Sequence, residues 1–507
     1  MQKLLFLLFF LNSSVFAQTY RNPVIAGDFP DPTVIRVGEN YYAAGTTSDF
    51  APVYPLYHSR DLVNWKLIGS IFNEMPDWVK GDCWAPELYY HNETYFAYYT
   101  ARRKSDNITC IGVATTKDIS QGFTDQGILI EWGNEAIDAY IFKDDDGKLY
   151  ISWKAYGLDE RPIEILASEL SDDGMSLVGE HFSLTRHDKG WEGSGDEGQC
   201  IVKHRDYYYL FYSVGGCCDN RCDYRVRVAR SKSIKGDWVQ YENNPILQGG
   251  DLWNCTGHGT LVQTPDNRYF YLYHAYQKYD FEFVGRQALL DQVLWNEETG
   301  WPYFKNGNIP STQTEVPFKG TVQKKDMHFH DSFNTDDFDK YWLHDVNLPV
   351  PELLKDNSFL IFINPGEGIS FRGINPKSGI YNMETSISNE DQNFKGLCVY
   401  GNKSNLVAWG IEDKTLKLYE WRNGVKKELF SKPCTATQIT FKVESRNARL
   451  FRFYWSENGK DWEIYSELGV DGSFLPQWGK GVRAGLVVET KNDSKMGKFL
   501  YFDLQNK

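Results

Sequence analysis

The chain has 507 residues, more than one ordinary hydrophobic core can use, so two domains are expected. Aromatic residues make up 16% of it and 43 residues are glycine, a composition typical of many short strands joined by turns. A formal net charge of -14 and a pI near 5.3 exclude a nucleic-acid partner, because no basic run offsets the repulsion from a phosphate backbone.

Residues 1–17 are predicted to be a secretory signal peptide. Lys3 precedes an apolar stretch from Leu4 to Leu11, and a short segment ending at Ala17 has the small-residue pattern of a cleavage site. The apolar stretch is too short for a permanent anchor, and no later run of about 18 apolar residues follows. We expect cleavage after Ala17 and a soluble, secreted or periplasmic protein without a membrane span.

Residues 20–315 contain an internal repeat. An aromatic run recurs five times, beginning at Tyr41, Tyr95, Tyr150, Tyr207 and Tyr269. The steps between these runs are 54, 55, 57 and 62 residues, in the range of radially repeated β structures. Turn signals at 144–147 and 264–267 fall between apolar runs, where a tight hairpin is required. The repeat predicts a five-bladed β-propeller of antiparallel blades.

A polar residue precedes each aromatic run by about ten residues: Asp31, Glu87, Asp138, Glu197 and His258. The residue that opens the inner strand of a blade can point into the axial channel. We therefore expect Asp31, Asp138 and Glu197 to meet at one end of the channel. The other two should lie nearby. Crowded carboxylates raise one another's pKa, so one can stay protonated near neutral pH, as acid–base hydrolysis requires.

Each of these residues also has a simpler interpretation. A carboxylate at the start of a strand is commonly a turn cap, and Glu87 is as compatible with a structural hydrogen bond as with a ligand contact. His258, between two glycines, is compatible with an ordinary buried histidine. In the hydrolase interpretation, Trp84 and Trp153 supply faces for sugar rings and Arg286 holds hydroxyl groups.

The loop after the fourth aromatic run contains Cys217, Cys218 and Cys222, three of the nine cysteines. In an exported chain a disulfide in this loop is the preferred interpretation. A zinc site is the weaker alternative, because no neighbouring histidine completes four ligands. The odd number of cysteines leaves at least one free thiol unless two chains cross-link.

From Phe329 onward the chain changes character. Strand-like runs alternate with period two, at 358–363, 416–421, 438–443 and 450–455. No convincing amphipathic helix is found there. After a connection near residue 316, residues 326–507 are predicted to form an antiparallel β-sandwich of the concanavalin or lectin-like kind.

Several motifs resemble those of glycoside hydrolase family 43 in their order and spacing, over roughly residues 21–305: 21–24, 28–32, 84–87, 136–138, 197–198, 257–259, 285–287 and 295–302. The resemblance implies a propeller that hydrolyses glycosidic bonds with inversion. It implies that Asp31 is the general base, Glu197 the general acid, and Asp138 the residue that orients the acid and tunes its pKa. Inversion requires the acid and base carboxyls to lie about 6.5–9.5 Å apart.

The resemblance implies no cofactor for the chemistry itself, but in relatives the histidine matching His258 lies near a calcium ion. A structural calcium near His258, bound mostly through water, is therefore expected. Two departures concern Ala139 and Gln199, which stand where the family has proline. Rival assignments are Glu192 for the acid and Asp28 for the base.

Residues 54–65 and the added sandwich resemble exo-acting members, the β-xylosidases and α-L-arabinofuranosidases. The expected function is removal of terminal β-D-xylose or α-L-arabinofuranose from plant cell-wall polysaccharide or its oligosaccharides. Action on arabinan or galactan is an alternative within the family. A carbohydrate-binding propeller without catalytic activity is the alternative from another class, because aromatic-lined channels also bind sugars without chemistry.

Overall fold

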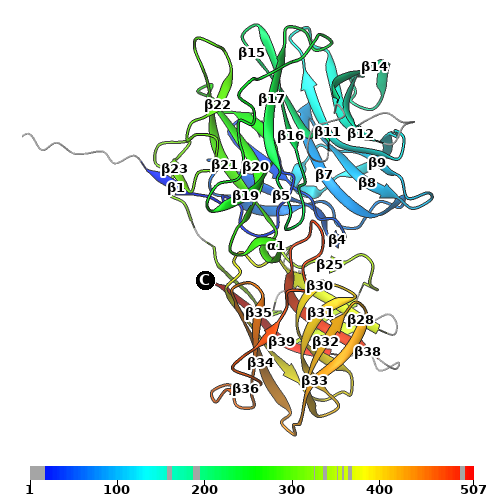
Figure 1. Ribbon diagram of the computed structural model, residues 1–507. Coiled ribbons are helices and arrows are strands. Elements are labelled where there is room, and N and C mark those ends of the chain that lie inside the picture. The colour runs from blue at the N-terminus through cyan, green and yellow to red at the C-terminus, as the bar shows by residue number, and fades with distance from the viewer. Residues whose placement is uncertain are drawn as a thin grey trace, which may run out of the picture.

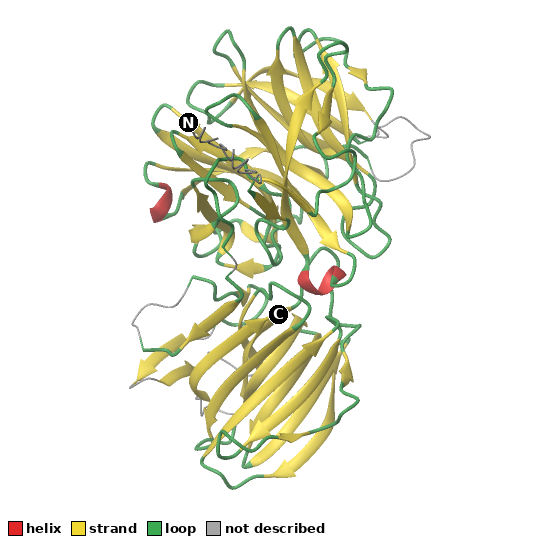
Figure 2. Ribbon diagram, turned by 90° about the vertical axis from the view of Figure 1, so that its left-hand side faces the viewer, coloured by secondary structure: helices red, strands yellow, loops and turns green. Residues whose placement is uncertain are grey.

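The computed structural model describes residues 18–156, 163–186, 195–324, 326–334, 340–350, 352–356, 359–363, 368–490 and 497–507. Almost all of its regular structure is β, in a propeller followed along the chain by a sandwich (Figures 1 and 2). The predicted fold class is confirmed. The predicted signal peptide lies outside the described residues. Within the described ranges, no helix is long and apolar enough to cross a membrane.

Each propeller blade is an antiparallel meander of four strands. The first two blades are β2 (Thr33–Val37), β3 (Asn40–Ala44), β5 (Val53–Ser59) and β6 (Lys66–Phe72), then β7 (Val79–His91), β8 (Thr94–Arg103), β9 (Thr109–Thr116) and β10 (Thr124–Ile130). The third is β11 (Glu135–Lys143), β12 (Leu149–Tyr156), β13 (Glu164–Leu170) and β14 (Leu177–Arg186). The last two are β15 (Glu197–His204), β16 (Tyr207–Val214), β17 (Arg225–Ser231) and β18 (Val239–Gln240), then β19 (Trp253–Gln263), β20 (Tyr269–Gln277), β21 (Arg286–Trp295) and β22 (Pro302–Phe304).

The inner strands β2, β7, β11, β15 and β19 contact one another in that order, and β19 contacts β2, so they form a closed ring. The ends of this part are tied together by pairing of β1 (Thr19–Arg21) with β23 (Gln313–Glu315). The second strand of a blade packs against neighbouring blades on both faces. The aromatic run of β16 is therefore almost entirely buried, which explains why its sequence does not alternate.

The sandwich consists of two antiparallel sheets whose inner faces share a hydrophobic core that includes Trp409, Phe441 and Phe499. One sheet contains β24 (His328–Asp331), β26 (Glu352–Asp356), β27 (Phe359–Ile363), β29 (Tyr381–Ser388), β34 (Gln438–Arg446), β35 (Leu450–Ser456), β36 (Glu463–Ile464), β37 (Val470–Asp471) and β39 (Gly497–Asn506). The other contains β28 (Gly368–Ile374), β30 (Phe394–Asn402), β31 (Asn405–Glu412), β32 (Thr415–Arg422), β33 (Val425–Pro433) and β38 (Arg483–Thr490).

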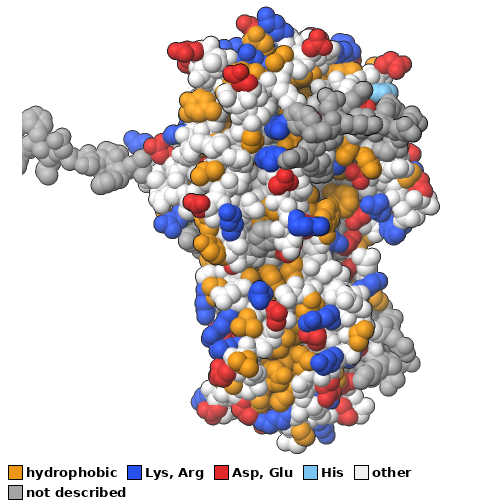
Figure 3. Space-filling model, in the orientation of Figure 1, with side chains coloured by type: hydrophobic (Ala, Val, Ile, Leu, Met, Phe, Trp, Pro, Cys, Tyr) orange, Lys and Arg blue, Asp and Glu red, His pale blue; other side chains and the backbone are white. Residues whose placement is uncertain are grey.

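The two parts are joined by specific contacts across a waist that Figure 3 shows between them. β4 (Phe50–Ala51) of the propeller pairs with β25 (His344–Asp345). The Arg483 guanidinium at the start of β38 donates to the Asp28 carboxylate at 2.9 Å, and both side chains are buried. Near this junction lies the single-turn helix α1 (Phe281–Val284). The sandwich therefore packs against the end of the propeller where β2 and β21 begin.

Candidate active site

The inner strands depart from regular pairing at the end where the polar residues lie. Asp31, just before β2, has a φ of 52°, and Asp138 and His258 have φ values of 59° and 41° at β-bulges in β11 and β19. Such a bulge redirects a side chain that a regular strand would place elsewhere. In β7, Ala85 has positive φ in the bulge nearest Glu87, and in β15 Gly198 has positive φ in the bulge beside Glu197.

The repeat had indicated that the five polar residues are equivalent. Their positions relative to the bulges show that they are not strictly so. Glu197 lies one residue before its bulge position and still reaches the centre, whereas Glu87 lies two residues after its own. Gly198 also has a packing reason to be glycine. A Cβ there would lie 2.7 Å from Cγ of His258, so a side chain would push this histidine away from the carboxylates.

Asp31 is buried and surrounded by positive or donating groups. One carboxylate oxygen accepts from Arg286 Nη1 at 2.8 Å, and the other accepts from the Thr46 hydroxyl at 2.6 Å. Burial alone raises the pKa of Asp31, but the charge of Arg286, with contributions from His258 and His274, outweighs it and holds the pKa well below its usual range. Asp31 is therefore ionised at every working pH.

Asp138 and Glu197 share a second part of the cluster with different electrostatics. Glu197 accepts from Lys154 Nζ at 2.7 Å and from the Tyr224 hydroxyl at 2.8 Å. Burial raises the pKa of Glu197, and Lys154 more than offsets this, so its pKa is lowered. Burial raises the pKa of Asp138 to about 7, with the charge of Glu197 adding to the effect. Asp138 is therefore the carboxyl of this pair that keeps a proton near neutral pH in the free protein.

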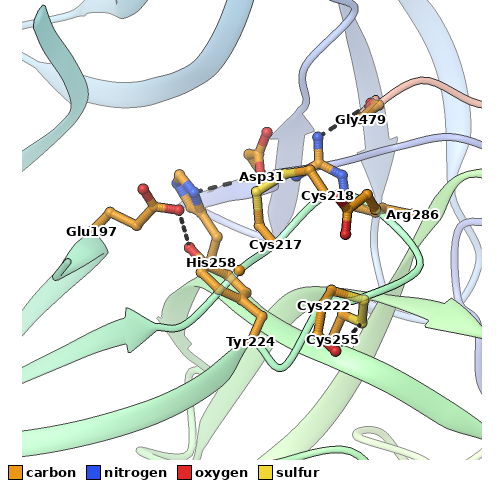
Figure 4. Close-up of a disulfide and its surroundings, with 12 residues drawn as sticks. Asp31, Glu197, Cys217, Cys218, Cys222, Tyr224, Cys255, His258, Arg286 and Gly479 are labelled. Carbon is orange, nitrogen blue, oxygen red and sulfur yellow. Dashed lines mark hydrogen bonds and ion pairs between the residues drawn. A yellow bond between two sulfur atoms is a disulfide. The ribbon is translucent and has the colours of Figure 1, made fainter. Parts of the chain in front are cut away.

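His258 projects between the two groups of carboxylates. Its Nδ1 lies 3.5 Å from a carboxylate oxygen of Asp31 and 3.8 Å from one of Asp138. Its backbone N–H donates to the Ser213 hydroxyl at 2.8 Å, which fixes the bulge. Figure 4 shows His258 directed at Asp31, with Glu197 and Tyr224 on its other side. The sequence prediction that Asp31, Asp138 and Glu197 converge near His258 agrees with this arrangement.

Three residues of the site were not singled out in the sequence: Lys154, Tyr224 and His274. His274 is fully buried, stacks on Tyr224, and accepts from the backbone N–H of Asp31 through Nδ1 at 3.1 Å. Burial lowers the pKa of His274 to about 4, helped by Arg286, so this ring is neutral. A sequence signal existed only for Lys154, which is the next residue after the aromatic candidate Trp153.

Trp153 itself does not line the site. It is 1% exposed and packs against Trp132 inside the blade, with ring centroids 6.2 Å apart. Successive side chains of a strand point to opposite faces, so Lys154 occupies the channel side that the sequence had assigned to its neighbour. Of the two interpretations given for Glu87, the structure fits the structural hydrogen bond: Glu87 is 5% exposed and accepts from the Thr33 hydroxyl at 2.6 Å, between β7 and β2.

Trp84 and Arg286 lie at the boundary with the sandwich. The Trp84 ring meets Trp478 edge to face, with centroids 6.4 Å apart. Arg286 binds Asp31 with one terminal nitrogen and reaches the Gly479 carbonyl with the other at 3.4 Å. The sandwich loop that contains Trp478 and Gly479 therefore forms part of the site. Arg286 has the Asp31 carboxylate as a partner, and its predicted contact with sugar hydroxyl groups stays a prediction.

The rival assignments are placed differently. The Asp28 carboxylate accepts from Arg483, from Gly481 N at 3.0 Å and from Arg286 N at 3.1 Å, so it belongs to the junction with the sandwich. Glu192 lies outside the described residues. Behind Asp28 and Arg483 is a crevice between the two parts, lined by residues such as Tyr57 and Tyr341. It contains none of the axial carboxylates.

A calcium ion does not find a ready-made set of ligands at His258. The imidazole nitrogen faces Asp31 and Asp138, whose oxygens already contact Arg286 and Gly198 N, whereas calcium requires six to eight oxygen ligands. Over the described ranges, the group with metal-ligand spacing is His328, His330 and Asp503 at the sandwich surface. The calcium near His258 stays a prediction, and no chemical step depends on it.

Two disulfides flank the site (Figure 4). Cys217 pairs with its neighbour Cys218, which is a disulfide within the loop, as predicted. Cys222 pairs with Cys255 on β19, a partner outside the loop. The other five cysteines, all within the described residues, are buried thiols. The loop from β16 to β17 is thus tied to the strand that carries His258.

Comparison with known proteins identifies the family. The model of the glycosyl hydrolases family 43 matches residues 20–302, more than half of the chain. The chain belongs to glycoside hydrolase family 43. Its resemblance to that family, expected from the motifs, is confirmed.

Two relatives illustrate the similarity. A xylan 1,3-β-xylosidase of a Vibrio species is 32% identical over 330 residues, which cover 59% of this chain and 60% of that protein. A xylosidase/arabinosidase of Humicola insolens is 29% identical over 318 residues, which cover 59% of this chain and 57% of that protein. The chain thus matches less than two thirds of the length of these relatives.

A solved structure extends the likeness to the sandwich. The family 43 protein of Bacillus licheniformis superposes with a TM-score of 0.83 at 25% identity, covering 97% of this chain and all of that one. Propeller and sandwich together are therefore an arrangement that this family 43 chain shares with a known member.

Proposed function

We propose that this family 43 enzyme is an exo-acting, inverting glycoside hydrolase that removes terminal β-D-xylose or α-L-arabinofuranose. The observation that carries the proposal is the axial cluster. In it Asp31 is held ionised, whereas the pair Asp138 and Glu197 retains one proton near neutral pH. Such a division of charge is what a general base and a general acid need. The names of the curated relatives, a xylosidase and a xylosidase/arabinosidase, support the pentose.

Asp31 is the proposed general base. It accepts a proton from the attacking water as that oxygen bonds to the anomeric carbon. Arg286 and Thr46 fix the orientation of both its oxygens, and His274 holds its backbone N–H. The lowered pKa makes Asp31 a weak base toward free water. Proton transfer becomes favourable only as the sugar ring gains positive charge late in the reaction.

Glu197 is the proposed general acid, assisted by Asp138. The two carboxyls titrate as a coupled pair, so the proton belongs to the pair rather than to one residue. In the free protein the pKa shifts place this proton on Asp138. The reaction needs it on Glu197, which donates it to the oxygen of the departing sugar. Asp138, whose carboxylate accepts from Gly198 N at 3.2 Å, holds the backbone beside the acid.

The sandwich supports attack at chain ends. Trp478 and Gly479 come from the sandwich loop and stand against Trp84 and Arg286 at the mouth of the site. A wall on this side of the site favours binding of a terminal sugar over an internal one. Plant cell-wall polysaccharide or its oligosaccharides are the proposed substrates. A secreted or periplasmic location, with a cleaved signal peptide, fits such substrates and is part of the proposal.

A release assay with a matched pair of variants tests the proposal. Aryl β-D-xylosides, aryl α-L-arabinofuranosides and the corresponding oligosaccharides are offered to the wild type, to Glu197→Gln and to Glu169→Gln, whose carboxylate pairs with Lys148 on the surface. We expect single pentoses from chain ends, and Glu197→Gln should be slower by roughly 10³-fold on oligosaccharides because proton donation is lost. The Glu169→Gln variant should match the wild type.

Aryl substrates with good leaving groups should be less affected in Glu197→Gln, and sugar binding should be retained. Full activity of Glu197→Gln on oligosaccharides would refute the assignment of the acid. Sugar binding without release from any substrate would favour the non-catalytic binding protein.

A further inference from the structure

The Cys217–Cys218 disulfide occupies a place in the site that the reaction does not by itself explain. The bond joins consecutive residues, so it closes a small ring and connects no distant parts of the chain. The Cys222–Cys255 disulfide, whose cysteines are 33 residues apart, already links the loop between β16 and β17 to β19. A role in local stability alone therefore does not account for the second disulfide.

Its neighbours include a hydrogen-bond partner of the proposed base and a hydrogen-bond partner of the proposed acid. The Cys218 carbonyl accepts from Gly479 N at 2.9 Å, and the Gly479 carbonyl accepts from Arg286, the partner of Asp31. On the other side, Cys217 packs against the cluster that contains Tyr224, whose hydroxyl donates to Glu197. The disulfide thus lies between the partner of the proposed base and the partner of the proposed acid.

Gly479 brings the sandwich loop into direct contact with this ring. Its φ of 69° favours glycine, and a Cβ there would lie 3.7 Å from Cβ of Cys218 and 3.8 Å from Nη2 of Arg286. Cys218 is buried by these contacts, while Cys217 stays half-buried. Figure 4 shows the disulfide in the middle of the group, with Asp31 and His258 on one side and Arg286 on the other.

The chemistry of a disulfide complements that of the carboxylates. Asp31, Glu197 and Arg286 offer charge and hydrogen bonds, which suit the hydroxyl edge of a sugar. A pentose ring also has an apolar C–H face, for which the charged side chains of the axial cluster are poor partners. Sulfur is polarisable and makes favourable dispersion contacts without accepting strong hydrogen bonds. A sugar site of this kind needs an apolar wall with a few convergent polar groups.

We propose that the Cys217–Cys218 disulfide is a sugar-contacting wall of the active site, which receives the C–H face of the terminal pentose and is held in place by Gly479 of the sandwich. The inference rests on the proposed glycosidase function and names two residues of its binding site. The wall contacts the sugar in the ground state and in the transition state alike. Its loss should therefore weaken binding and leave the chemical step nearly unchanged.

The test is the double variant Cys217→Ser/Cys218→Ser, which removes the bond with little change in volume and leaves no single thiol to mispair. With an aryl pentoside, KM and the inhibition constant of the free pentose product should both rise by about tenfold, and kcat should stay within about threefold. Circular dichroism and the melting temperature should match the wild type. Equal KM and equal inhibition by pentose would overturn the proposal, as would a fall in kcat alone.

Reduction of the wild type provides an independent arm. A dithiol supplies two electrons and two protons, converts Cys217–Cys218 into two thiols and is itself oxidised to a cyclic disulfide. The reduced wild type should acquire the KM of the double variant, and the double variant should not respond. An equal response of the double variant would assign the effect to Cys222–Cys255 and contradict the proposal. Absence of pentose release from the untreated wild type would instead count against the proposed function.

Discussion

Lys154 controls the charge of the proposed acid pair. Its Nζ lies 2.7 Å from Glu197 and 3.6 Å from Glu135, and the side chain is buried, so its charge is weakly screened. Lys154 lowers the pKa of both Glu197 and Asp138, although burial is the larger influence on each. The activity that depends on a proton in this pair should be lost as the pH rises through about 7.

Lys154→Gln should move that loss to higher pH. Without the ammonium group the pair holds its proton more tightly, and the basic limb of kcat/KM should shift upward by about 1 pH unit. The measurement is a pH profile with an aryl pentoside. Lys148→Gln, which breaks an exposed pair with Glu169 in the same blade, is the control and should leave the limb in place. If the basic limb of the kcat/KM profile does not shift in Lys154→Gln, a group other than this carboxyl pair determines the loss of activity at high pH.

Glu87 makes a separate prediction about stability. Burial raises the pKa of Glu87 to about 8, partly offset by the hydrogen bond from Thr33. A carboxyl with a raised folded pKa contributes stability that is fully present below the unfolded pKa and is lost as the pH rises through the folded value. For Glu87 this window extends from about 4.5 to about 8.

Glu87→Gln should remove this dependence on pH, because glutamine imitates the protonated acid. Relative to the wild type, its melting temperature should improve steadily between pH 5 and pH 8. The comparison is a series of thermal melts of both proteins in matched buffers. Parallel curves for the two proteins would show that Glu87 does not carry the proton. This prediction also separates Glu87 from sugar binding, since kcat/KM near pH 6 should be unchanged.

At the scale of elements, the sandwich loop around Trp478 is the part of the second domain that meets the site. Trp478 is 59% exposed, so its ring is available to a sugar and contributes little to the core. Trp478→Ala should raise KM by several-fold with little change in kcat or in the melting temperature. Leu468→Ala, at an 84% exposed position of the sandwich, is the matched control. An unchanged KM in Trp478→Ala would place the sugar away from this loop.

Burial on both faces of the second strands of the blades determines how much of these elements the sequence can predict. The aromatic runs fall on the second strands of the blades because neighbouring blades bury both faces. Side chains of β12 alternate between its two faces, but both faces are buried. The sequence therefore does not show whether Trp153 or its neighbour Lys154 points into the channel. Cys255 was missed as the partner of Cys222 for a similar reason. Strand pairing, rather than spacing, brings the two loops together.

At the scale of the whole molecule, the propeller and the sandwich were predictable, and their junction was not. An internal repeat and a change in patterning are visible along the chain, whereas contacts such as Asp28 with Arg483 join positions 455 residues apart. The same junction brings Gly479 to Arg286. The sequence therefore indicated the axial carboxylates but not which residues of the sandwich lie beside them.

The Asp28–Arg483 pair should stabilise the junction in a way that a double-mutant cycle can measure. Arg483→Met leaves the buried Asp28 carboxylate without its cation and should cost about 3 kcal/mol in the free energy of unfolding. Asp28→Asn/Arg483→Met should lose less, because no unpaired charge remains. Lys498→Met, which breaks an exposed pair with Glu390, should have almost no effect. Additive losses in the cycle would show that the pair is not coupled.

The most direct test of the account is the anomeric form of the first sugar released. Proton NMR, recorded before mutarotation, follows the wild type acting on a β-D-xyloside and on an α-L-arabinofuranoside. A base at Asp31 and an acid at Glu197 on opposite sides of the bond predict that the opposite anomer, α-xylose or β-arabinose, appears first. Initial release of β-xylose or α-arabinose would mean retention through a covalent intermediate and would contradict the assigned roles.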